Sequence, residues 1–325
     1  MESSLIIYGD ALVEISALVE KLPEHGQDSI AKLITLKPGG SASNCAVVAS
    51  KLGARVKFIS MVGNDFYGNM VIDDLISQDV DLSSIKVVEG DTATVIVMID
   101  NTGERTMISY RGVAEVEPYG SVSDIIFKPG DILHVSGYNF QSKFSKATSL
   151  ELIELAKQQQ VKISLDPSYN FANLSNSEYS EVLSSLDYFF PNQIEALVAS
   201  KSDCIFEAMS TFHKKGVDTV LLKMGANGCY YSNSREREKI DAYVIPDPID
   251  TTGAGDAFAG GFLAATLKNL SHIEAMKIGA AAASIIVNVI GGHSASLDTG
   301  RLSEFALRHD DYQLFQAIKK LDEKR

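Results

Sequence analysis

Positive charge is scarce in this sequence. Its 325 residues include 29 lysines and arginines against 42 aspartates and glutamates, which gives a formal net charge of −13 at pH 7. A protein that binds nucleic acid needs a basic face to neutralise phosphates. The composition therefore argues against a nucleic-acid partner. It does not argue against a small anionic substrate, because salt screens a distant negative surface while a few local donors act at the site.

Cysteines, signal-peptide features and long apolar runs are also few. Cys45, Cys204 and Cys229 form neither a CxxC pair nor a disulfide framework, so we expect reduced thiols in a cytoplasmic protein. The first residues, MESSLIIYGD, lack the basic region that opens a signal peptide. The most apolar run, IGAAAASIIVNVIGG, is too short to span a bilayer and is predicted to be a buried helix. We expect no membrane partner.

Strand-like and helix-like patterns alternate along the chain, with no linker, repeat or low-complexity tract between them. Alternation of this kind predicts an α/β fold with a doubly wound, mostly parallel sheet flanked by helices. We expect residues 1–325 to form a single domain. The predicted strands are 4–9, 55–63, 131–137, 161–166, 187–191 and 218–225, and the predicted helices are 41–53, 66–78, 143–160, 177–185 and 205–214.

Two segments break this alternation. Residues 91–110 contain two strands of alternating polarity around an Asn-Thr-Gly turn, which predicts a β-hairpin. Residues 11–36 also alternate, with Pro23 and Gly26 between the extended parts. We expect segments of about 11–36 and 91–112 to form a small β lid that stands off the main sheet.

The stretch DTTGAGDAFAGGF, from Asp250 to Phe262, is predicted to begin a helix at Gly253–Asp256. Free N–H groups and the helix dipole favour an anion at such a turn, and glycine lets a ligand approach the backbone. Asp256 would repel a phosphate there, unless the reaction moves a phosphoryl group onto a hydroxyl. The amides would then hold the phosphoryl oxygens while the carboxylate accepts the hydroxyl proton. The simpler alternative is a first-turn helix acid beside packing glycines.

Two other anion-binding loops fit this stretch poorly. The chain has no GxxxxGK[ST] sequence, so a Walker-type loop would lack its lysine. Phe258 stands where a dinucleotide fingerprint needs its third glycine, and the stretch comes late in the chain instead of after the first strand. These features argue against a nicotinamide-dependent oxidoreductase.

The same stretch resembles the C-terminal signature of the ribokinase-like (PfkB) carbohydrate kinases. A second stretch, KPGGSASNCAVVASKLG at 37–53, resembles that family's N-terminal signature, about 210 residues earlier. The resemblance implies an ATP- and Mg²⁺-dependent kinase with Asp256 as catalytic base and an anion hole formed by the backbone of Gly253, Ala254 and Gly255. It also implies that Asp250 and Thr252 help to hold K⁺, although both side chains can simply brace the turn.

Further motifs resemble the nucleotide side of the family's site. In FFPNQIEA, Asn192 and Glu195 match the NxxE motif that places Mg²⁺ and the nucleotide phosphates, often through water. The alternative is an N-cap with a capping box. LLKMGANG matches a nucleotide-lining loop, which implies roles for Lys223, Gly225 and Gly228, while Asn288 is expected near the adenine.

The residues expected to bind the phosphate acceptor match the family's pattern less fully. Gly39, Gly40 and Asn44 match positions that contact sugar hydroxyls. Glu14 stands where many members carry an aspartate, and Leu12 replaces a polar residue of ribokinase, which argues against ribokinase specificity.

A lid arginine gives a further clue to the acceptor. Arg111, in ISYRGVAEV, resembles the substrate-facing lid arginine of fructokinases and 2-keto-3-deoxygluconate kinases. Asn170 stands where the latter enzymes carry a second arginine, so we favour a neutral sugar.

The sequence thus predicts a kinase that transfers the γ-phosphoryl group of ATP to a primary hydroxyl of a sugar, in the manner of a fructokinase. The alternatives are a 2-keto-3-deoxygluconate-type sugar-acid kinase and a nucleoside or riboside kinase. A distant alternative is an inactive sugar or nucleotide sensor on the same fold. Relatives often pair their lids between subunits, and the hairpin's exposed edge gives a physical reason to expect a homodimer here.

Overall fold

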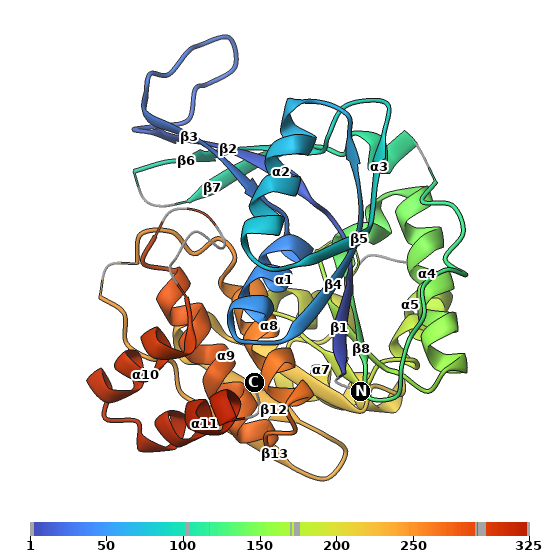
Figure 1. The fold of residues 1–325 in the computed structure, drawn as a ribbon. Helices are drawn as coiled ribbons and strands as arrows, with labels where there is room; N and C mark the ends of the chain where they lie inside the picture. The colour runs from blue at the N-terminus through green and yellow to red at the C-terminus, as the bar shows by residue number, and fades with distance from the viewer. Residues whose placement is uncertain are drawn as a thin grey trace.

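A nine-stranded sheet forms the centre of the molecule (Figure 1). The computed structural model describes residues 3–101, 104–116, 118–169, 171, 176–246, 248–289, 291 and 297–323. The strand order is β13-β12-β11-β10-β9-β8-β1-β4-β5, parallel from β11 to β5, with β12 and β13 antiparallel at one edge. The strands are β1 Ser4–Tyr8, β4 Arg55–Gly63, β5 Asp81–Val88, β8 Ile132–Ser136, β9 Lys162–Asp166, β10 Tyr188–Phe189, β11 Thr219–Lys223, β12 Cys229–Ser232 and β13 Arg237–Ile240.

Helices cover both faces of this sheet, because successive strand residues point to opposite faces. In β1, Leu5 and Ile7 belong to one apolar core, and Ile6 and Tyr8 belong to the other. The predicted doubly wound α/β class is therefore confirmed. The helices are α1 Ser41–Lys51, α2 Phe66–Ser77, α3 Val113–Val116, α4 Lys143–Gln158, α5 Asn176–Leu183, α6 Gln193–Ser200, α7 Ile205–Lys214, α8 Ala254–Leu267, α9 His272–Ile286, α10 Thr299–Arg308 and α11 Tyr312–Glu323, with 3₁₀ turns at η1 Gly137–Gln141 and η3 Gly225–Asn227.

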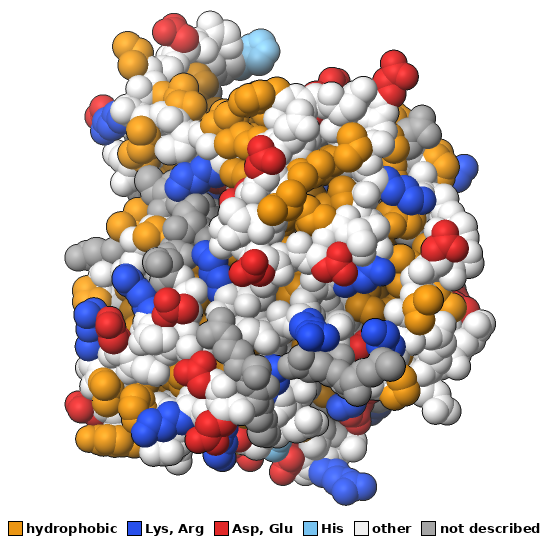
Figure 2. Space-filling model, viewed as in Figure 1, with side chains coloured by type: hydrophobic (Ala, Val, Ile, Leu, Met, Phe, Trp, Pro, Cys, Tyr) orange, Lys and Arg blue, Asp and Glu red, His pale blue; other side chains and the backbone are white. Residues whose placement is uncertain are grey.

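A second, four-stranded sheet stands off the main body at the upper left of Figure 1. Its order is β3-β2-β6-β7, formed by β2 Leu12–Val19, β3 Ala31–Gly39, β6 Thr94–Ile99 and β7 Arg105–Tyr110. β6 and β7 pair antiparallel, which confirms the predicted hairpin. On the face shown in Figure 2, hydrophobic side chains gather over the upper part of the molecule, where Figure 1 places this sheet and α2.

Some elements differ from the sequence prediction. β5 was not predicted, because its mixed burial lacks the continuous apolar run of a central parallel strand. The antiparallel β12–β13 hairpin was also missed. The apolar run predicted as a helix over 278–292 is helical only to Ile286 among the residues described. No helix in the described part of the chain is long and apolar enough to cross a membrane.

The arrangement brings several loops to one edge. In a parallel sheet, ligands bind beyond the carboxyl ends of the strands. The carboxyl ends of β1, β8, β9, β10 and β11 lie together because these strands are neighbours and parallel. The second sheet begins at the same edge, since the chain passes from β1 to β2 within a few residues.

Candidate active site

The predicted first turn of α8 is present. α8 begins at Ala254, and Gly253 precedes it with φ 77°, a left-handed conformation that glycine adopts without strain. Among the described residues, no side chain caps this helix. The N–H of Ala254 donates to the carbonyl oxygen of Thr251 at 3.3 Å. Helix geometry leaves the other N–H groups of the first turn without intrahelical acceptors, so the turn can receive an anion from outside.

Asp256 lies in this turn and is held by α1. Ser41 Oγ donates a hydrogen bond to Asp256 Oδ1, and Asn44 Nδ2 donates one to Oδ2, both at 2.8 Å. The two helices can approach because α8 carries glycine at the contact. A Cβ on Gly260 would lie 2.7 Å from the carbonyl oxygen of Cys45. The glycines of the signature thus have a packing role as well as a place in the turn.

The pKa of Asp256 is raised to about 6, first by burial and then by the negative charge of Asp166. The hydrogen bonds from Asn44 and Ser41, and the positive charge of Lys223, act in the opposite direction. Asp256 is therefore mainly ionised at neutral pH, and its pKa lies close enough to neutral pH for the carboxylate to take up a proton. A proton acceptor is most effective when its pKa lies near the working pH.

A buried ion pair lies beside this turn. Lys223, at the end of β11, places Nζ 2.7 Å and 2.6 Å from the two carboxylate oxygens of Asp166, at the end of β9. Burial raises the pKa of Asp166 to about 6, which Lys223 opposes. Burial alone would lower the pKa of Lys223, but Asp166 and Glu195 raise it. The pair is thus ionised at pH 7. A Cβ on Gly255 would lie 3.0 Å from Lys223 Nζ, so the lysine lies against the turn.

Asn192 and Glu195 form the capping box that was the structural alternative for this motif. Asn192 Oδ1 accepts from the Glu195 N–H at 2.9 Å, and Glu195 Oε2 accepts from the Asn192 N–H at 2.8 Å. The backbone of Asn192 also forms an isolated parallel β-bridge with that of Lys223, the last residue of β11. Burial raises the pKa of Glu195, against the effect of Lys223. The box therefore fixes a carboxylate next to the ion pair.

The chemistry of these groups fits Mg²⁺. Carboxylate and amide oxygens are its protein ligands, and it usually keeps several waters. Within the described residues there is no group of three or more His, Cys, Asp or Glu side chains arranged to hold a metal ion. A magnesium ion at this edge would therefore depend on water and phosphate oxygens for most of its ligands.

Asp250 and Thr252 brace the start of the turn. Asp250 is 5% exposed, and its two oxygens accept from the N–H groups of Thr252 at 2.8 Å and Gly291 at 3.0 Å. Thr252 Oγ1 accepts a hydrogen bond of 2.7 Å from Arg105 Nη1 on β7. The bracing alternative is thus present in the structure.

The predicted acceptor residues lie near the start of α1. Gly40 has φ 109°, and a Cβ there would lie 2.5 Å from the carbonyl oxygen of Asp10. Asp10 Oδ2 accepts from the Ser41 N–H at 3.1 Å. A Cβ on Gly39 would lie 3.8 Å from Glu14 Cβ, so Glu14 of β2 is close to this turn. Asn44 lies on α1, and its side-chain amide donates a hydrogen bond to Asp256.

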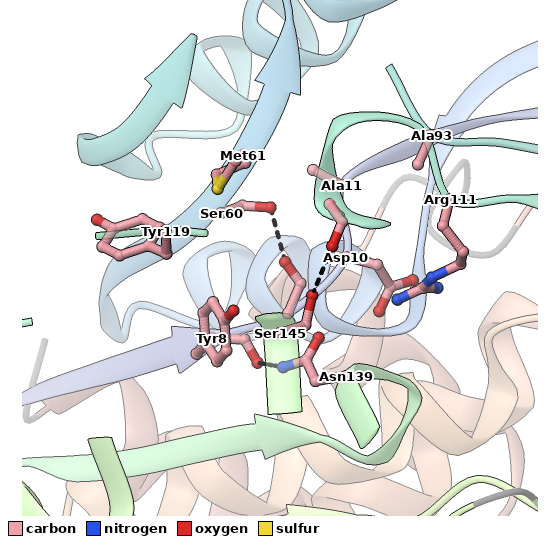
Figure 3. A pocket seen from close by; sticks show the side chains of 12 residues that line it. Tyr8, Asp10, Ala11, Ser60, Met61, Ala93, Arg111, Tyr119, Asn139 and Ser145 are labelled. Atoms are coloured by element: carbon pink, nitrogen blue, oxygen red, sulfur yellow. Dashed lines mark hydrogen bonds between the residues drawn. The ribbon is translucent and has the colours of Figure 1, made fainter. Parts of the chain in front are cut away.

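Arg111 lines a small cavity together with Asp10 and Asn139 (Figure 3). Its Nη2 donates to the carbonyl oxygen of Tyr138 at 3.3 Å. Its Nε is buried, without a hydrogen-bond partner among the described residues. Asn139 Nδ2 donates a hydrogen bond of 3.1 Å to the carbonyl oxygen of Tyr8 (Figure 3). Asn170, on which the preference for a neutral sugar depended, lies outside the described residues.

The remaining nucleotide candidates follow β11 and α9. Gly228 has φ 86°, and a Cβ there would lie 2.0 Å from the carbonyl oxygen of Ile240, so the loop requires glycine. Gly225 has φ 55° and open space around its Cβ position. Asn288 is exposed, and its amide donates to the carbonyl oxygen of Ser284 at 2.9 Å. Of the described contacts, none links Asn288 to the hydrogen bonds around Asp256.

Three residues of this site were missed in the sequence. Asp166 ends a predicted strand, so the rule that ligands bind at carboxyl strand ends is a signal that identifies it. Ser41 is the first residue of the helix in the N-terminal signature, and no other feature of the sequence indicated a role in the site. Arg105 had no signal, because its contact with Thr252 joins segments 147 positions apart.

The fold is α/β, and the site places a buried carboxylate, Asp256, in the first turn of α8. Residues 2–299 match the family described as pfkB family carbohydrate kinase, and the chain belongs to this family. It is therefore a carbohydrate kinase. It is 28% identical to a ribokinase of Haemophilus influenzae, over 91% of this chain and 95% of that protein. A fructokinase of Vibrio alginolyticus is 31% identical, over 79% of this chain and 82% of that protein.

The fold is also that of a solved ribokinase. The structure of Arabidopsis thaliana ribokinase complexed with ribose and ATP superposes with a TM-score of 0.77 at 24% identity, covering 98% of this chain and 99% of that one. At this identity the likeness establishes the fold.

We expect activity to fall as the pH drops through about 6, because Asp256 must be ionised to accept a proton. Ser41→Ala removes a donor that favours the ionised form, so it should raise the pKa of Asp256 and move the acidic limb of the kcat/KM profile to higher pH. The measurement is kcat/KM between pH 5 and 9.

Ser43→Ala is the matched control. It lies on the same helix, and its buried hydroxyl has no hydrogen-bond partner among the described residues. Its profile should match the unmodified protein. An acidic limb that stays in place in Ser41→Ala would contradict the assignment of the limb to Asp256.

Proposed function

We propose that this kinase transfers the γ-phosphoryl group of ATP to a primary hydroxyl of a neutral sugar, as a fructokinase does. The observation that carries the proposal is the position of Asp256, in the first turn of α8 and fixed by Ser41 and Asn44. The N–H groups of Gly253, Ala254 and Gly255 hold the phosphoryl oxygens. Asp256 takes the proton of the attacking hydroxyl as the new oxygen–phosphorus bond forms and the bond to ADP breaks.

The cofactors in this proposal are ATP and Mg²⁺. A related structure, a putative ribokinase II from E. coli, is a complex with ATP and Mg²⁺. Asp166, Glu195 and Asp256 surround the one positive charge of Lys223 with three carboxylates, two more than this charge balances. Magnesium neutralises charge on the nucleotide phosphates when it is bound. Asn192 and Glu195 would hold it through water.

The nucleotide itself lies, in this proposal, against the loop after β11. Lys223, Gly225 and Gly228 contact the phosphates and ribose, and Asn288 closes the adenine side. Asp250 and Thr252 contribute to a K⁺ site beside the turn. Their hard oxygen atoms suit such an ion, whose field would strengthen the turn's attraction for anions.

Glu14, Gly39, Gly40, Asn44 and Arg111 bind the acceptor in this proposal. Position 12, where ribokinase has a polar residue, is a buried leucine in this chain and offers no hydrogen-bonding group. A second candidate, a sugar-acid kinase, is favoured by the Nε of Arg111, which has no hydrogen-bond partner in the part of the chain that the structure describes. A carboxylate would satisfy this donor with a charge-assisted hydrogen bond.

The second sheet serves as a lid, in one domain spanning residues 1–325 with lid segments at about 11–36 and 91–112. Closing it over the sugar would exclude water as a competing acceptor. Three free cysteines support a reducing, cytoplasmic location.

Replacing Asp256 with asparagine keeps the size of the side chain and removes the proton acceptor. We expect kcat to fall about 10²–10⁴-fold while MgATP binding persists, since a positioned base is typically worth that factor. ADP release is measured with MgATP, with and without K⁺, across neutral sugars, sugar acids, sugar phosphates and nucleosides.

Asp298→Asn is the matched control, because it makes the same change at the N-cap of α10, where asparagine caps equally well. Near-normal turnover in Asp256→Asn would refute the assignment of Asp256 as the catalytic base. Intact ATP binding with no acceptor in the whole panel would favour the sensor.

We also propose that the outer face of the second sheet joins two copies into a homodimer. The strand registers place Leu36, Ile15, Ile96 and Ile108 side by side in one row across all four strands. Ile15 is partly buried against the main apolar core, whereas the other three are exposed. Ile96 is 41% exposed and Ile108 is 60% exposed. Both sheet edges, β3 and β7, also offer backbone groups for pairing with another chain.

Ile34→Lys and Ile108→Lys place a charge on this face and should convert the dimer to a monomer, as measured by light scattering after size-exclusion chromatography. Ile126→Lys, at a position 70% exposed outside the sheet, should leave the dimer intact. A monomeric unmodified protein would contradict the proposal.

A further inference from the structure

Thr92 lies where the chain leaves the main sheet for the second sheet. It stands between β5, which ends at Val88, and β6, which begins at Thr94. Connecting segments usually run over the surface, but Thr92 is only 1% exposed. Buried polar groups are held by hydrogen bonds, so the partners of Thr92 show how the second sheet is attached to the body.

Asp65, the N-cap of α2, holds Thr92 at two points. Its Oδ2 accepts from the Thr92 N–H at 3.0 Å, and its Oδ1 accepts from Thr92 Oγ1 at 2.5 Å. Thr92 Oγ1 also accepts from the N–H of Gly63, the last residue of β4, at 2.9 Å. We call these three residues and their hydrogen bonds the Asp65 clamp. The clamp ties the segment that enters the second sheet to both β4 and α2.

The carboxylate of Asp65 strengthens this attachment. Burial would raise the pKa of Asp65, but hydrogen bonds from Thr92 and Gly68 lower it overall. The group is therefore ionised at neutral pH, and hydrogen bonds to an ionised acceptor are about twice as strong as neutral ones. Oδ1 also accepts from the Gly68 N–H at 2.7 Å, which caps α2. One charged group thus serves as helix cap and as anchor.

Backbone packing keeps the clamp from shifting. A Cβ on Gly63 would lie 2.1 Å from the carbonyl oxygen of Gly90, and a Cβ on Gly68 would lie 2.1 Å from that of Gly63. Backbones that approach so closely require glycine. Groups packed in this way cannot move without displacing their neighbours, so the clamp is a rigid part of the body.

The chain also leaves the second sheet at this place. The carbonyl oxygen of Asp91 accepts from the Val113 N–H at 2.9 Å. Gly112 has φ 54°, and a Cβ there would lie 2.3 Å from the same oxygen. Both ends of the β6–β7 hairpin therefore meet at the clamp. The next residues into the second sheet, Ala93 and Arg111, line the cavity of the predicted acceptor site (Figure 3).

The β6–β7 hairpin extends from the clamp toward the start of α8. Each of its strands has six residues, which span about 20 Å. At the end far from the clamp, Arg105 contacts Thr252, which precedes the first turn of α8. A small rotation at the clamp is amplified over this length. The clamp therefore decides how the hairpin lies over the site.

We propose that Asp65 is a positioning residue that fixes the pivot about which the second sheet closes. Because the clamp does not shift, closure brings Ala93 and Arg111 back to one place relative to the acceptor. The closed sheet then keeps water away from the γ-phosphoryl group. Asp65 acts through Thr92 and does not touch ATP or the sugar. This inference rests on the proposed kinase reaction.

A loosened pivot has a measurable consequence. With the sheet displaced, water attacks the γ-phosphorus: a new oxygen–phosphorus bond forms, the bond to ADP breaks, and a proton of the water passes to solvent. The products are ADP and inorganic phosphate, whereas correct transfer gives ADP and sugar phosphate. The amount of inorganic phosphate per ADP reports on the pivot, because this ratio does not depend on how much of the protein is folded.

The test measures this ratio for the full-length protein with MgATP and D-fructose, or with the sugar of the panel above that gives the fastest turnover. Asp65→Asn keeps the cap of α2, because asparagine caps equally well, but its Nδ2 cannot accept from Thr92. Inorganic phosphate per ADP should rise about tenfold, the effect of losing a hydrogen bond to a charged group. KM for the sugar should rise similarly, while the affinity for MgADP should change less than about twofold.

Two variants of Thr92 separate the hydrogen bond from packing. Thr92→Val keeps the shape and loses the hydroxyl, so it should raise the ratio as Asp65→Asn does. Thr92→Ser keeps the hydroxyl and should leave the ratio near that of the unmodified protein. The matched controls are Asp298→Asn, at the N-cap of α10, and Thr219→Val, at a buried threonine of β11. Neither control should change the ratio.

Each result decides the proposal. An unchanged ratio and KM in Asp65→Asn and Thr92→Val, with only a lower melting temperature, would show that the clamp merely stabilises the fold, and would overturn the proposal. Equal effects of Thr92→Ser and Thr92→Val would also overturn it. An unmodified protein that releases no ADP with any acceptor would overturn the kinase proposal, and this inference with it. A ratio raised in Asp65→Asn and Thr92→Val but normal in Thr92→Ser would support it.

Discussion

The contact between α1 and α8 holds the rest of this site in place. Asp256 is an acid in the first turn of a helix, close to the acidic Asp166, and its pKa is raised. It stays there because Ser41 and Asn44 donate to its two oxygens, and because Gly260 lets α8 approach the backbone of α1 at Cys45. The two family signatures are therefore the two halves of one helix contact, although they are far apart in the sequence. A larger residue at 260 would separate Asp256 from Ser41 and Asn44, the side chains that orient it.

The charges around this contact explain how a carboxylate and the proposed anion hole could share one turn. The N–H groups of the turn point along the axis of α8, while Asp256 is drawn sideways toward α1 by its two donors. In the proposed reaction, the two groups would thus face different parts of a transition state in which a phosphoryl group meets a hydroxyl. Lys223 lies against Gly255 of the turn and is held there by Asp166. Each charged group is fixed by a partner from another element, so little rearrangement is needed at the moment of reaction.

Much of the fold could be predicted from the sequence, because buried parallel strands read as short apolar runs and their helices as periodic patterns. The edge strand β5 and the β12–β13 hairpin were missed because they lack such a pattern. The helices α10 and α11 were also not predicted, although their buried apolar residues have helical spacing. In the site, Asp256 and its turn were predictable because the chemistry is local. The capping box of Asn192 and Glu195 was foreseen only as an alternative, and the structure contains it. Arg105 was unpredictable, because only the folded second sheet brings it to Thr252.

In the proposed reaction, the turn at Gly253–Gly255 and the carboxylate of Asp256 act on the two sides of one phosphoryl transfer. The most direct test is a crystal structure with MgADP, aluminium fluoride and the acceptor sugar. We expect the fluoride to receive hydrogen bonds from the amides of the turn, with the acceptor hydroxyl in line behind it and bonded to Asp256. A fluoride held away from α8, or an acceptor hydroxyl directed away from Asp256, would contradict the account.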